Sequence, residues 1–259
     1  MPIKYKILGN VAIVRVDIKQ PGLEEIVQKI VTYNPHVVAV LGYRGIYGDY
    51  REPEVELLWG KLPEMIMHTE YGVHYCLDPS KLMFSLGNLL ERLRVASLVR
   101  SWEIVVDMFA GVGQFTLPIA VHARPRLIHA IEINPIAYDY LVRNIRLNNV
   151  GDIVMPYLSD CRELSSKLKT KADRVIMGYF YGIADFLPHA LQMLGESGGI
   201  IHLHQLVKRD EMEQLKQKIY SLNSSLGFTT EILTSRVVKS YSASKIHVVI
   251  DMFVVNQDR

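Results

Sequence analysis

Hydrophobic and polar positions follow a regular strand and helix pattern through most of the chain beyond Arg100. Short apolar runs, typical of strands buried in a parallel sheet, alternate with segments whose apolar residues recur at helical spacing. We expect strands at residues 104–109, 127–132, 153–158, 174–178 and 199–204, and helices at 115–122, 135–148, 184–194 and 209–226. This alternation predicts a doubly wound, Rossmann-like α/β sheet with ligands at the carboxyl ends of its strands.

The two ends of the chain have different patterns. Apolar runs at 230–238 and 247–255, separated by a short polar turn, predict a C-terminal antiparallel hairpin. Near the N-terminus we expect a strand at 11–16, a helix at 23–33 and a strand at 36–41, then a Gly-, Tyr- and Arg-rich loop to Pro53. A hairpin at 65–77 and a helix at 85–99 follow. We therefore divide the chain into a small N-terminal α/β module, residues 1–80, and a catalytic domain, residues 81–259.

Composition limits the classes of protein to consider. With 49% hydrophobic and 22% charged residues the chain resembles a globular protein, and no apolar stretch approaches the roughly 20 residues of a membrane span. The first residues lack the apolar core of a signal peptide, and two cysteines are too few for a disulfide framework, so we expect a cytoplasmic protein. Basic residues number 29 against 27 acidic ones, so an RNA site must be a local patch.

A glycine-containing loop follows the first strand of the repeated pattern. Its sequence, residues 107–113, is Asp-Met-Phe-Ala-Gly-Val-Gly, and Ala110, Gly111 and Gly113 let a ligand approach the backbone. A dinucleotide fingerprint would place a third glycine at Thr116, which argues against NAD and a dehydrogenase. The carboxylate of Asp107 would repel a pyrophosphate and attract a cation. The loop therefore favours S-adenosylmethionine, whose α-ammonium and sulfonium groups are positive.

Carboxylates end the next two strands. Glu132 follows the glycine loop by roughly 20 residues, where a carboxylate accepts from both ribose hydroxyls of a bound nucleoside, although it can also cap the next helix. Asp160 and Cys161 follow the third strand. There a carboxylate can accept from the adenine amino group while a main-chain N–H reaches a ring nitrogen. Asp160 can also serve as a helix N-cap, and the two roles are compatible.

Two histidines alternate on the strand at 199–204. His202 and His204 face the same side, an arrangement found in metal and RNA sites but more often in packed pocket walls. Further ligands at recognisable spacing are missing from the sequence, so we predict no metal.

These motifs resemble those of tRNA-modifying transferases that act on the guanosine beside the anticodon. Two related families share the loop 107–113, the segment Glu-Ile-Asn-Pro at 132–135, the helix end Asn-Ile-Arg-Leu-Asn at 144–148 and the hairpin 236–251. One is the tRNA guanine-37 N1-methyltransferase family. The other is the wybutosine-synthesis tRNA 3-amino-3-carboxypropyltransferase family, whose archaeal short form this chain resembles over residues 40–255. The resemblance implies a class I methyltransferase-like fold with S-adenosylmethionine as donor. Many members carry a further N-terminal RNA-binding domain, which we expect this chain to lack.

Two segments favour the aminocarboxypropyltransferase family. The stretch 83–88, Met-Phe-Ser-Leu-Gly-Asn, is similar to that family. The methyltransferases usually place an Asn-Leu-Pro or Asn-Pro-Pro motif after the fourth strand, where this chain has Met177-Gly178-Tyr179. The resemblance thus implies transfer of the aminocarboxypropyl group to the tricyclic base of tRNA(Phe), in the anticodon loop, by a protein that we expect to be monomeric. The 1–80 module is a candidate RNA contact.

The resemblance also assigns two residues near position 90 to the donor site. Ser85 and Arg92 are close to two helical turns apart and face the same way, and Arg92 suits the α-carboxylate of the methionine moiety. An N-capping serine and a surface arginine are the alternative. The general base is open, with Asp78, Tyr179 and His204 as candidates. Two other functions remain: tRNA guanine-37 N1-methylation, and a non-catalytic tRNA-binding role.

Overall fold

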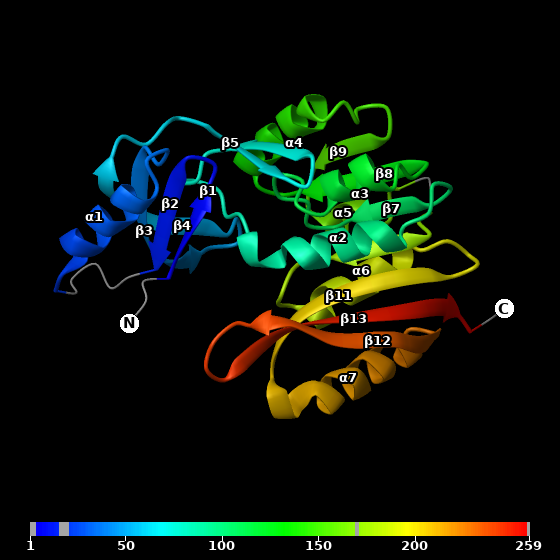
Figure 1. Cartoon of the computed structure of the whole chain (residues 1–259). Coiled ribbons are helices and arrows are strands. Elements are labelled where there is room, and N and C mark those ends of the chain that lie inside the picture. Colours follow the sequence, from blue (N-terminus) through cyan, green and yellow to red (C-terminus); the bar gives the residue numbers. More distant parts are fainter. Residues whose placement is uncertain (1–3, 16–20, 169–170, 258–259) are drawn as a thin grey trace.

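The computed structural model describes residues 4–15, 21–168 and 171–257. A small sheet carrying one helix lies beside a larger sheet covered by helices on both faces (Figure 1). This matches the predicted pairing of an N-terminal α/β module with a larger α/β domain. Val16, the last residue of a predicted strand, lies outside the described residues.

The N-terminal sheet has four strands in the order β1-β2-β3-β4, and α1 packs on one face. Its elements are β1 (Tyr5–Leu8), β2 (Val11–Arg15), α1 (Leu23–Tyr33), β3 (Ala39–Tyr47) and β4 (Glu52–Gly60). The predicted loop over residues 42–53 was wrong, because β3 continues to Tyr47 and β4 starts at Glu52. The glycines and polar residues of this stretch do not have the composition of a strand. It is a strand because β3 and β4 pair through main-chain hydrogen bonds.

A two-stranded hairpin connects the two parts. It consists of β5 (Ile66–Glu70) and β6 (Val73–Leu77), as the sequence predicts. The side chain of Asn144 accepts from the Cys76 N–H at 2.7 Å and donates to the Cys76 carbonyl at 3.1 Å, so β6 is fixed to the catalytic domain. At its other end the main-chain N–H of Gly9 donates to His68 at 3.2 Å. The hairpin contacts both parts, and a boundary near residue 80 stays a prediction.

The large sheet has the strand order β12-β13-β11-β10-β7-β8-β9. Its strands are β7 (Ile104–Asp107), β8 (Leu127–Glu132), β9 (Val154–Leu158), β10 (Arg174–Met177), β11 (Gly199–Lys208), β12 (Phe228–Ser240) and β13 (Lys245–Asn256). The first five are parallel, while β13 runs antiparallel between β11 and β12. The doubly wound sheet and its C-terminal hairpin are therefore confirmed, and strand order reverses beside β7, where a ligand is expected.

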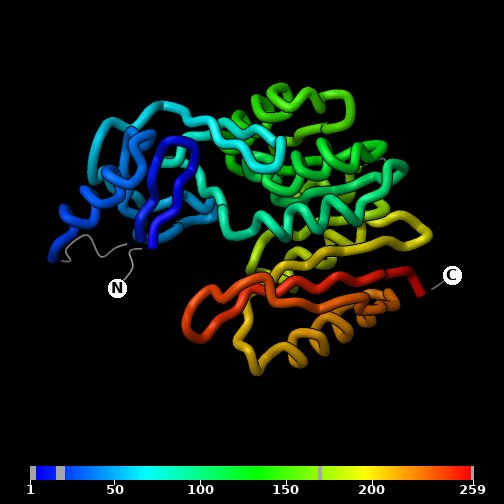
Figure 2. The backbone as a smooth tube through the Cα atoms, viewed as in Figure 1, coloured from blue at the N-terminus to red at the C-terminus, as the bar shows by residue number. Residues whose placement is uncertain are grey.

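Helices cover both faces of this sheet and create two cores. One face carries α2 (Leu89–Leu98), α3 (Thr116–His122) and α4 (Pro135–Leu147), preceded by a 3-10 turn at Leu86–Asn88. The other carries α5 (Cys161–Leu164), α6 (Ile183–Met193) and α7 (Met212–Ser225), with a second 3-10 turn at Arg209–Glu211. The turn joining β12 to β13 extends toward the N-terminal sheet (Figure 2).

Candidate functional site

The glycine loop lies at the carboxyl end of β7, between that strand and α3. Gly111 and Gly113 have positive φ angles of 57° and 98°. A Cβ on Gly113 would lie 2.7 Å from Leu117, so a larger residue would collide with α3. On Gly111 the nearest atom would be Nε2 of Gln114 at 3.7 Å, which leaves open space above the loop. The loop main chain can therefore contact a ligand, as expected for Ala110, Gly111 and Gly113.

Asp107 lies beneath this loop and is completely buried. Its carboxylate accepts from the Thr116 hydroxyl at 2.8 Å and from the Phe109 N–H at 3.3 Å. Burial raises the pKa of Asp107 to about 6, while the bonds from Thr116 and Phe109 oppose the shift. The carboxylate thus fixes the shape of the loop, and its contact with the α-ammonium group of the donor stays a prediction.

Glu132 faces the glycine loop from the end of β8. One carboxylate oxygen accepts from the Gly111 N–H at 2.6 Å, and the other accepts from the Asn134 N–H at 2.8 Å. Burial raises its pKa, against those two main-chain hydrogen bonds. Each oxygen keeps a lone pair, because a carboxylate offers about four acceptor positions. The geometry therefore fits two ribose hydroxyls.

Asp160 and Cys161 lie at the start of α5, beyond β9. The Asp160 carboxylate caps the helix by accepting from the Arg162 N–H at 2.8 Å, and it pairs with the Arg162 guanidinium at 2.5 Å. The predicted N-cap is confirmed. The Cys161 side chain is buried, which raises its thiol pKa to about 12, so this residue is available to a ligand through its main chain only. Adenine recognition by the two residues stays a prediction.

Arg92 is fully buried, and its predicted alternative as a surface arginine was wrong. The guanidinium pairs with the Glu70 carboxylate of β5, lies over the Phe84 ring at 5.0 Å and donates to the Ser85 carbonyl at 2.9 Å. Ser85 makes no side-chain cap for the turn that follows it. The two residues are in contact through the Ser85 main chain, although Ser85 lies before α2 and not on the helix predicted from residue 85. Binding of the donor carboxylate by Arg92 stays a prediction, but this cation already has a carboxylate partner.

Gln114 joins the 85–92 segment to the glycine loop. Its side-chain oxygen accepts from the Ser85 N–H at 2.9 Å and from Arg92 at 3.3 Å, while its nitrogen donates to the Met83 carbonyl at 3.3 Å. Sequence reasoning missed this residue. The signal was a polar side chain directly after the glycine loop, between Gly113 and Phe115.

Of the three candidate bases, Tyr179 and His204 lie near the 178–180 turn, whereas Asp78 lies beside a separate pocket. The buried Asp78 carboxylate accepts from the Ser80 hydroxyl at 2.6 Å and lies 3.3 Å from the Lys81 ammonium. It borders a pocket of about 460 Å³ lined by Leu62, Pro63, Glu64, Ser80, Lys81 and Tyr140.

Tyr179 follows β10 and stacks on Phe109 of the glycine loop, with ring centroids 5.2 Å apart. The Arg51 guanidinium, from the turn between β3 and β4, lies 5.6 Å from the Tyr179 ring and 5.7 Å from the Phe180 ring. Tyr241, near the end of β12, packs edge-on against Phe180 at 6.1 Å. An arginine and several aromatic rings thus meet beside the glycine loop. The sequence places Arg51 in a loop, so its contacts with the Tyr179 and Phe180 rings were not predicted.

His204 is buried on β11 and bonds His247 of β13, with 2.9 Å between Nδ1 and Nε2. Burial lowers the pKa of both imidazoles, that of His247 to about 3, so both are neutral at physiological pH. Phe115 and Phe180 pack against the pair at 5.0 and 4.5 Å. The pair lies behind the 178–180 turn, and its role as a base stays a prediction.

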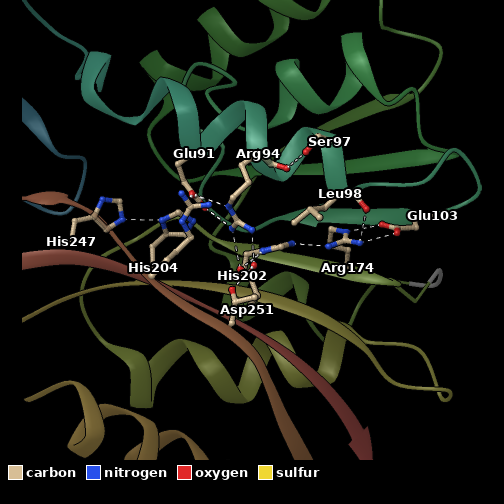
Figure 3. Close-up of polar contacts among 12 residues, drawn as sticks. Glu91, Arg94, Ser97, Leu98, Glu103, Arg174, His202, His204, His247 and Asp251 are labelled. Carbon is tan, nitrogen blue, oxygen red and sulfur yellow. Dashed lines mark hydrogen bonds and ion pairs between the residues drawn. The ribbon is translucent and has the colours of Figure 1, made fainter.

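His202 belongs to a separate buried network of charges that crosses the sheet under α2 (Figure 3). Arg174 pairs with Glu103 at 2.7 Å and donates to Nε2 of His202 at 2.7 Å. Because an arginine can only donate, the proton of His202 is on Nδ1, which donates to Asp251 at 2.6 Å. Asp251 also pairs with Arg94 at 2.7 Å. These partners give His202 a structural role.

Within residues 4–15, 21–168 and 171–257, no cluster of three or more His, Cys, Asp or Glu side chains has metal-binding geometry. The helices in the same ranges are too short or too polar to cross a bilayer.

Comparison with known proteins places this site in context. A family model for the TRM5/TYW2 methyltransferase domain matches residues 66–233, and one for the TYW2 N-terminal domain matches residues 1–63. The chain is 39% identical over 253 residues to the tRNA(Phe) (4-demethylwyosine(37)-C(7)) aminocarboxypropyltransferase of Methanocaldococcus jannaschii, covering 97% of this chain and 98% of that protein. The protein of the same name from Pyrococcus horikoshii is 35% identical over 262 residues, covering 98% of this chain and 90% of that protein.

Solved structures resemble the whole chain. M. jannaschii TYW2 in complex with AdoMet superposes with a TM-score of 0.77 at 34% identity, covering 98% of this chain and 100% of that one. Wild-type Trm5b from Pyrococcus abyssi superposes with a TM-score of 0.85 at 33% identity, covering 97% of this chain and 75% of that one. The predicted class I methyltransferase-like fold is confirmed.

Proposed function

Because this chain belongs to the TRM5/TYW2 methyltransferase-domain family, we infer that it is an S-adenosylmethionine-dependent transferase of tRNA modification. It transfers the 3-amino-3-carboxypropyl group to the tricyclic guanosine of tRNA(Phe) in wybutosine-derivative biosynthesis and releases methylthioadenosine. Its relatives of known activity match it over nearly their full lengths, and M. jannaschii TYW2 binds the same donor.

The reaction is a displacement at the donor. The sulfonium makes three carbons electrophilic, and the protein selects one by placing it against the nucleophile. A carbon of the tricyclic base forms a bond to the γ-carbon of the aminocarboxypropyl arm. The bond from that carbon to sulfur breaks, its electron pair stays on sulfur, and the base carbon then loses a proton. The protein must therefore direct the arm, rather than the methyl group, toward the RNA.

The observation that carries the assignment over N1-methylation is the segment 177–179, at the carboxyl end of β10. Met177 is buried, and the ring of Tyr179 lies on Phe109. A Cβ on Gly178 would meet Phe115 at 3.4 Å, so this turn packs closely against the glycine loop. Apolar and aromatic groups occupy the position where the related methyltransferases hold a ring nitrogen with an asparagine. A site of this kind suits a carbon nucleophile on an extended aromatic base.

For the RNA, we propose that the anticodon loop of tRNA(Phe) enters between the N-terminal sheet and the 178–181 turn. The Tyr179 and Tyr181 rings meet there at 5.7 Å, and Arg51 lies over Tyr179. Splayed RNA bases commonly stack on such rings and on guanidinium planes. We further propose that the enzyme acts as a monomer in the cytoplasm, where its tRNA substrate is found.

The test uses S-adenosylmethionine labelled in either the methyl or the carboxypropyl group, with precursor tRNA(Phe) as acceptor. We expect label in tRNA only from the carboxypropyl donor, with one methylthioadenosine released for each base modified. Label from the methyl donor alone would establish N1-methylation instead. Binding of tRNA without consumption of either donor would establish a non-catalytic role.

A further inference from the structure

Three cationic side chains meet at the turn that precedes α2. Lys239 of β12 donates to the Ser85 hydroxyl at 3.2 Å. A Cβ on Gly87 would lie 3.0 Å from the Lys239 nitrogen and 3.4 Å from the Lys6 nitrogen of β1, so the two ammonium groups flank this glycine. Arg92 approaches the same turn from inside the protein through the Ser85 carbonyl. The cluster joins elements that are far apart in the sequence.

The charge of this cluster is not balanced. Arg92 has Glu70 as its partner, but in the described part of the chain neither Lys6 nor Lys239 has a carboxylate within the 4.0 Å of an ion pair. Burial, followed by repulsion from Lys6 and Arg92, lowers the pKa of Lys239 to about 8. A partly buried ammonium among other cations is costly unless an anion joins it.

Lys239 is directed into the protein by an irregularity in its strand. The pairing of β12 with β13 shifts register between Val237 and Lys239. Such a bulge interrupts the alternation of side chains and re-aims the residues beside it. Val237 is left 46% exposed, while Lys239 is half-buried against Ser85.

The cluster adjoins the glycine loop. Gln114, which directly follows that loop, accepts from both the Ser85 N–H and Arg92, and its amide nitrogen is also the nearest atom to the open side of Gly111. The Gln114 side chain alone thus connects the open side of Gly111 with the Ser85–Gly87 turn. The α-carboxylate is the one anionic group of S-adenosylmethionine, so it is the group that an ammonium cluster would attract.

We propose that Lys239, assisted by Lys6, binds the α-carboxylate of the aminocarboxypropyl arm, and that Arg92 and Ser85 position this site rather than supply its main charge. The inference rests on the proposed function for the identity of the donor. The ion pair would hold the carboxylate end of the aminocarboxypropyl arm at the 85–87 turn. The γ-carbon, which lies between that carboxylate and the sulfur, would then have a fixed orientation. Orientation of the arm then follows from an ion pair unique to its terminus.

The test is calorimetry on Lys239→Met with two ligands that differ by one group. S-adenosylhomocysteine carries the carboxylate, whereas its decarboxylated analogue, S-adenosyl-3-thiopropylamine, lacks only that group. We expect Lys239→Met to bind S-adenosylhomocysteine about 10- to 100-fold more weakly, the size of one charge-assisted hydrogen bond, and to bind the analogue within about 2-fold of the wild type. Lys245→Met, an exposed lysine of the same hairpin, is the matched control and should change neither affinity.

The pH dependence separates a charge contact from packing. Lys239 is faced by Lys6, Arg92 with its partner Glu70, and His247 across the strand pair. Because only the charged amine holds a carboxylate, affinity for S-adenosylhomocysteine should be full below pH 8 and fall as the pH rises through the pKa of about 8. Lys239→Arg should fold, retain affinity, and abolish this fall, since a guanidinium stays charged.

Two results would overturn the inference. An equal loss for both ligands in Lys239→Met would mean that the side chain supports the turn rather than the carboxylate. Unchanged affinity for S-adenosylhomocysteine, with weaker tRNA binding and a shallower salt dependence, would assign Lys239 to an RNA phosphate. Neither measurement involves group transfer, so failure here is distinct from failure of the labelling experiment.

Discussion

At the scale of single residues, the buried carboxylate of Asp107 makes the free energy of unfolding depend on pH. Its pKa is about 6 in the folded protein against 3.8 in the unfolded chain. Because the folded state prefers the neutral acid, this contribution to stability is present below pH 3.8 and is lost as the pH rises through 6. The loss is on the order of 2 to 3 kcal/mol, since one pKa unit corresponds to about 1.4 kcal/mol.

Asp107→Asn removes the ionisation and keeps a group that can bond both Thr116 and Phe109. We expect its free energy of unfolding to decline less than that of the wild type between about pH 4 and pH 7. Urea unfolding at several pH values measures this difference. Asp139→Asn, an exposed carboxylate, is the control and should parallel the wild type. Parallel curves for Asp107→Asn would mean that Asp107 ionises freely.

The sequence predicted the residues whose position depends on neighbouring residues in the chain. It did not predict the environment of residues whose contacts are made with distant parts of the chain. Glu132 and Asp160 could be selected because one ends a predicted strand and the other follows the next, and both lie at the carboxyl ends of the parallel strands. The buried Arg92 is paired with Glu70 of the β5–β6 hairpin, and no local sequence pattern predicts that contact. Lys239 was missed for the same reason, since its neighbour Ser85 is 154 positions away.

At the scale of elements, the buried network joins β10, β11 and β13 to α2 above them. Asp251 accepts from His202, Arg94 and Thr234. Although burial favours the neutral acid, His202 and Arg94 hold the pKa of Asp251 well below its usual range. The carboxylate is therefore ionised, and removing its charge leaves Arg94 and His202 without their shared partner.

Asp251→Asn should lower the free energy of unfolding by about 3 kcal/mol or more, because one member of a buried charge network is lost. Glu213→Gln breaks only the exposed pair with Lys216 and should cost less than about 1 kcal/mol. Chemical denaturation of both variants gives the comparison. Equal small losses would show that the network contributes little, and that packing alone fixes α2 on the sheet.

Elements were predicted best where hydrophobic periodicity was strong. All five parallel strands came from largely apolar runs, which are expected for strands covered by helices on both faces. β1 was missed because its sequence, Tyr-Lys-Ile-Leu, is too short for a clear alternation. β4 is partly solvent-exposed and rich in charged residues, so pairing with β3, rather than its composition, makes it a strand.

At the scale of the whole molecule, the N-terminal sheet contacts the catalytic domain beside the glycine loop. Besides the position of Arg51 over Tyr179 and Phe180, the Asn134 side chain donates to the Tyr50 carbonyl at 3.3 Å. The turn between β3 and β4 is thus placed where the RNA base is expected.

Arg51→Ala should weaken tRNA binding by about 3- to 30-fold, the range of one cation-π contact, and leave affinity for S-adenosylhomocysteine unchanged. Arg44→Ala is the matched control: this arginine lies in the same sheet but pairs with Glu54 and Glu56. Filter binding of tRNA and calorimetry of the ligand separate the two effects. A parallel loss of both affinities would show that Arg51 holds the domains together instead.

The position of β13 has a consequence for biosynthesis. This strand lies between β11 and β12, both of which precede it in the chain, and it pairs with each along most of its length. Until β13 has left the ribosome, β11 has an open edge, and β12 has no neighbour in the sheet. His202 likewise lacks its aspartate. The nascent chain therefore cannot complete its core during elongation, and β11 is the segment that a ribosome-associated chaperone would need to shield.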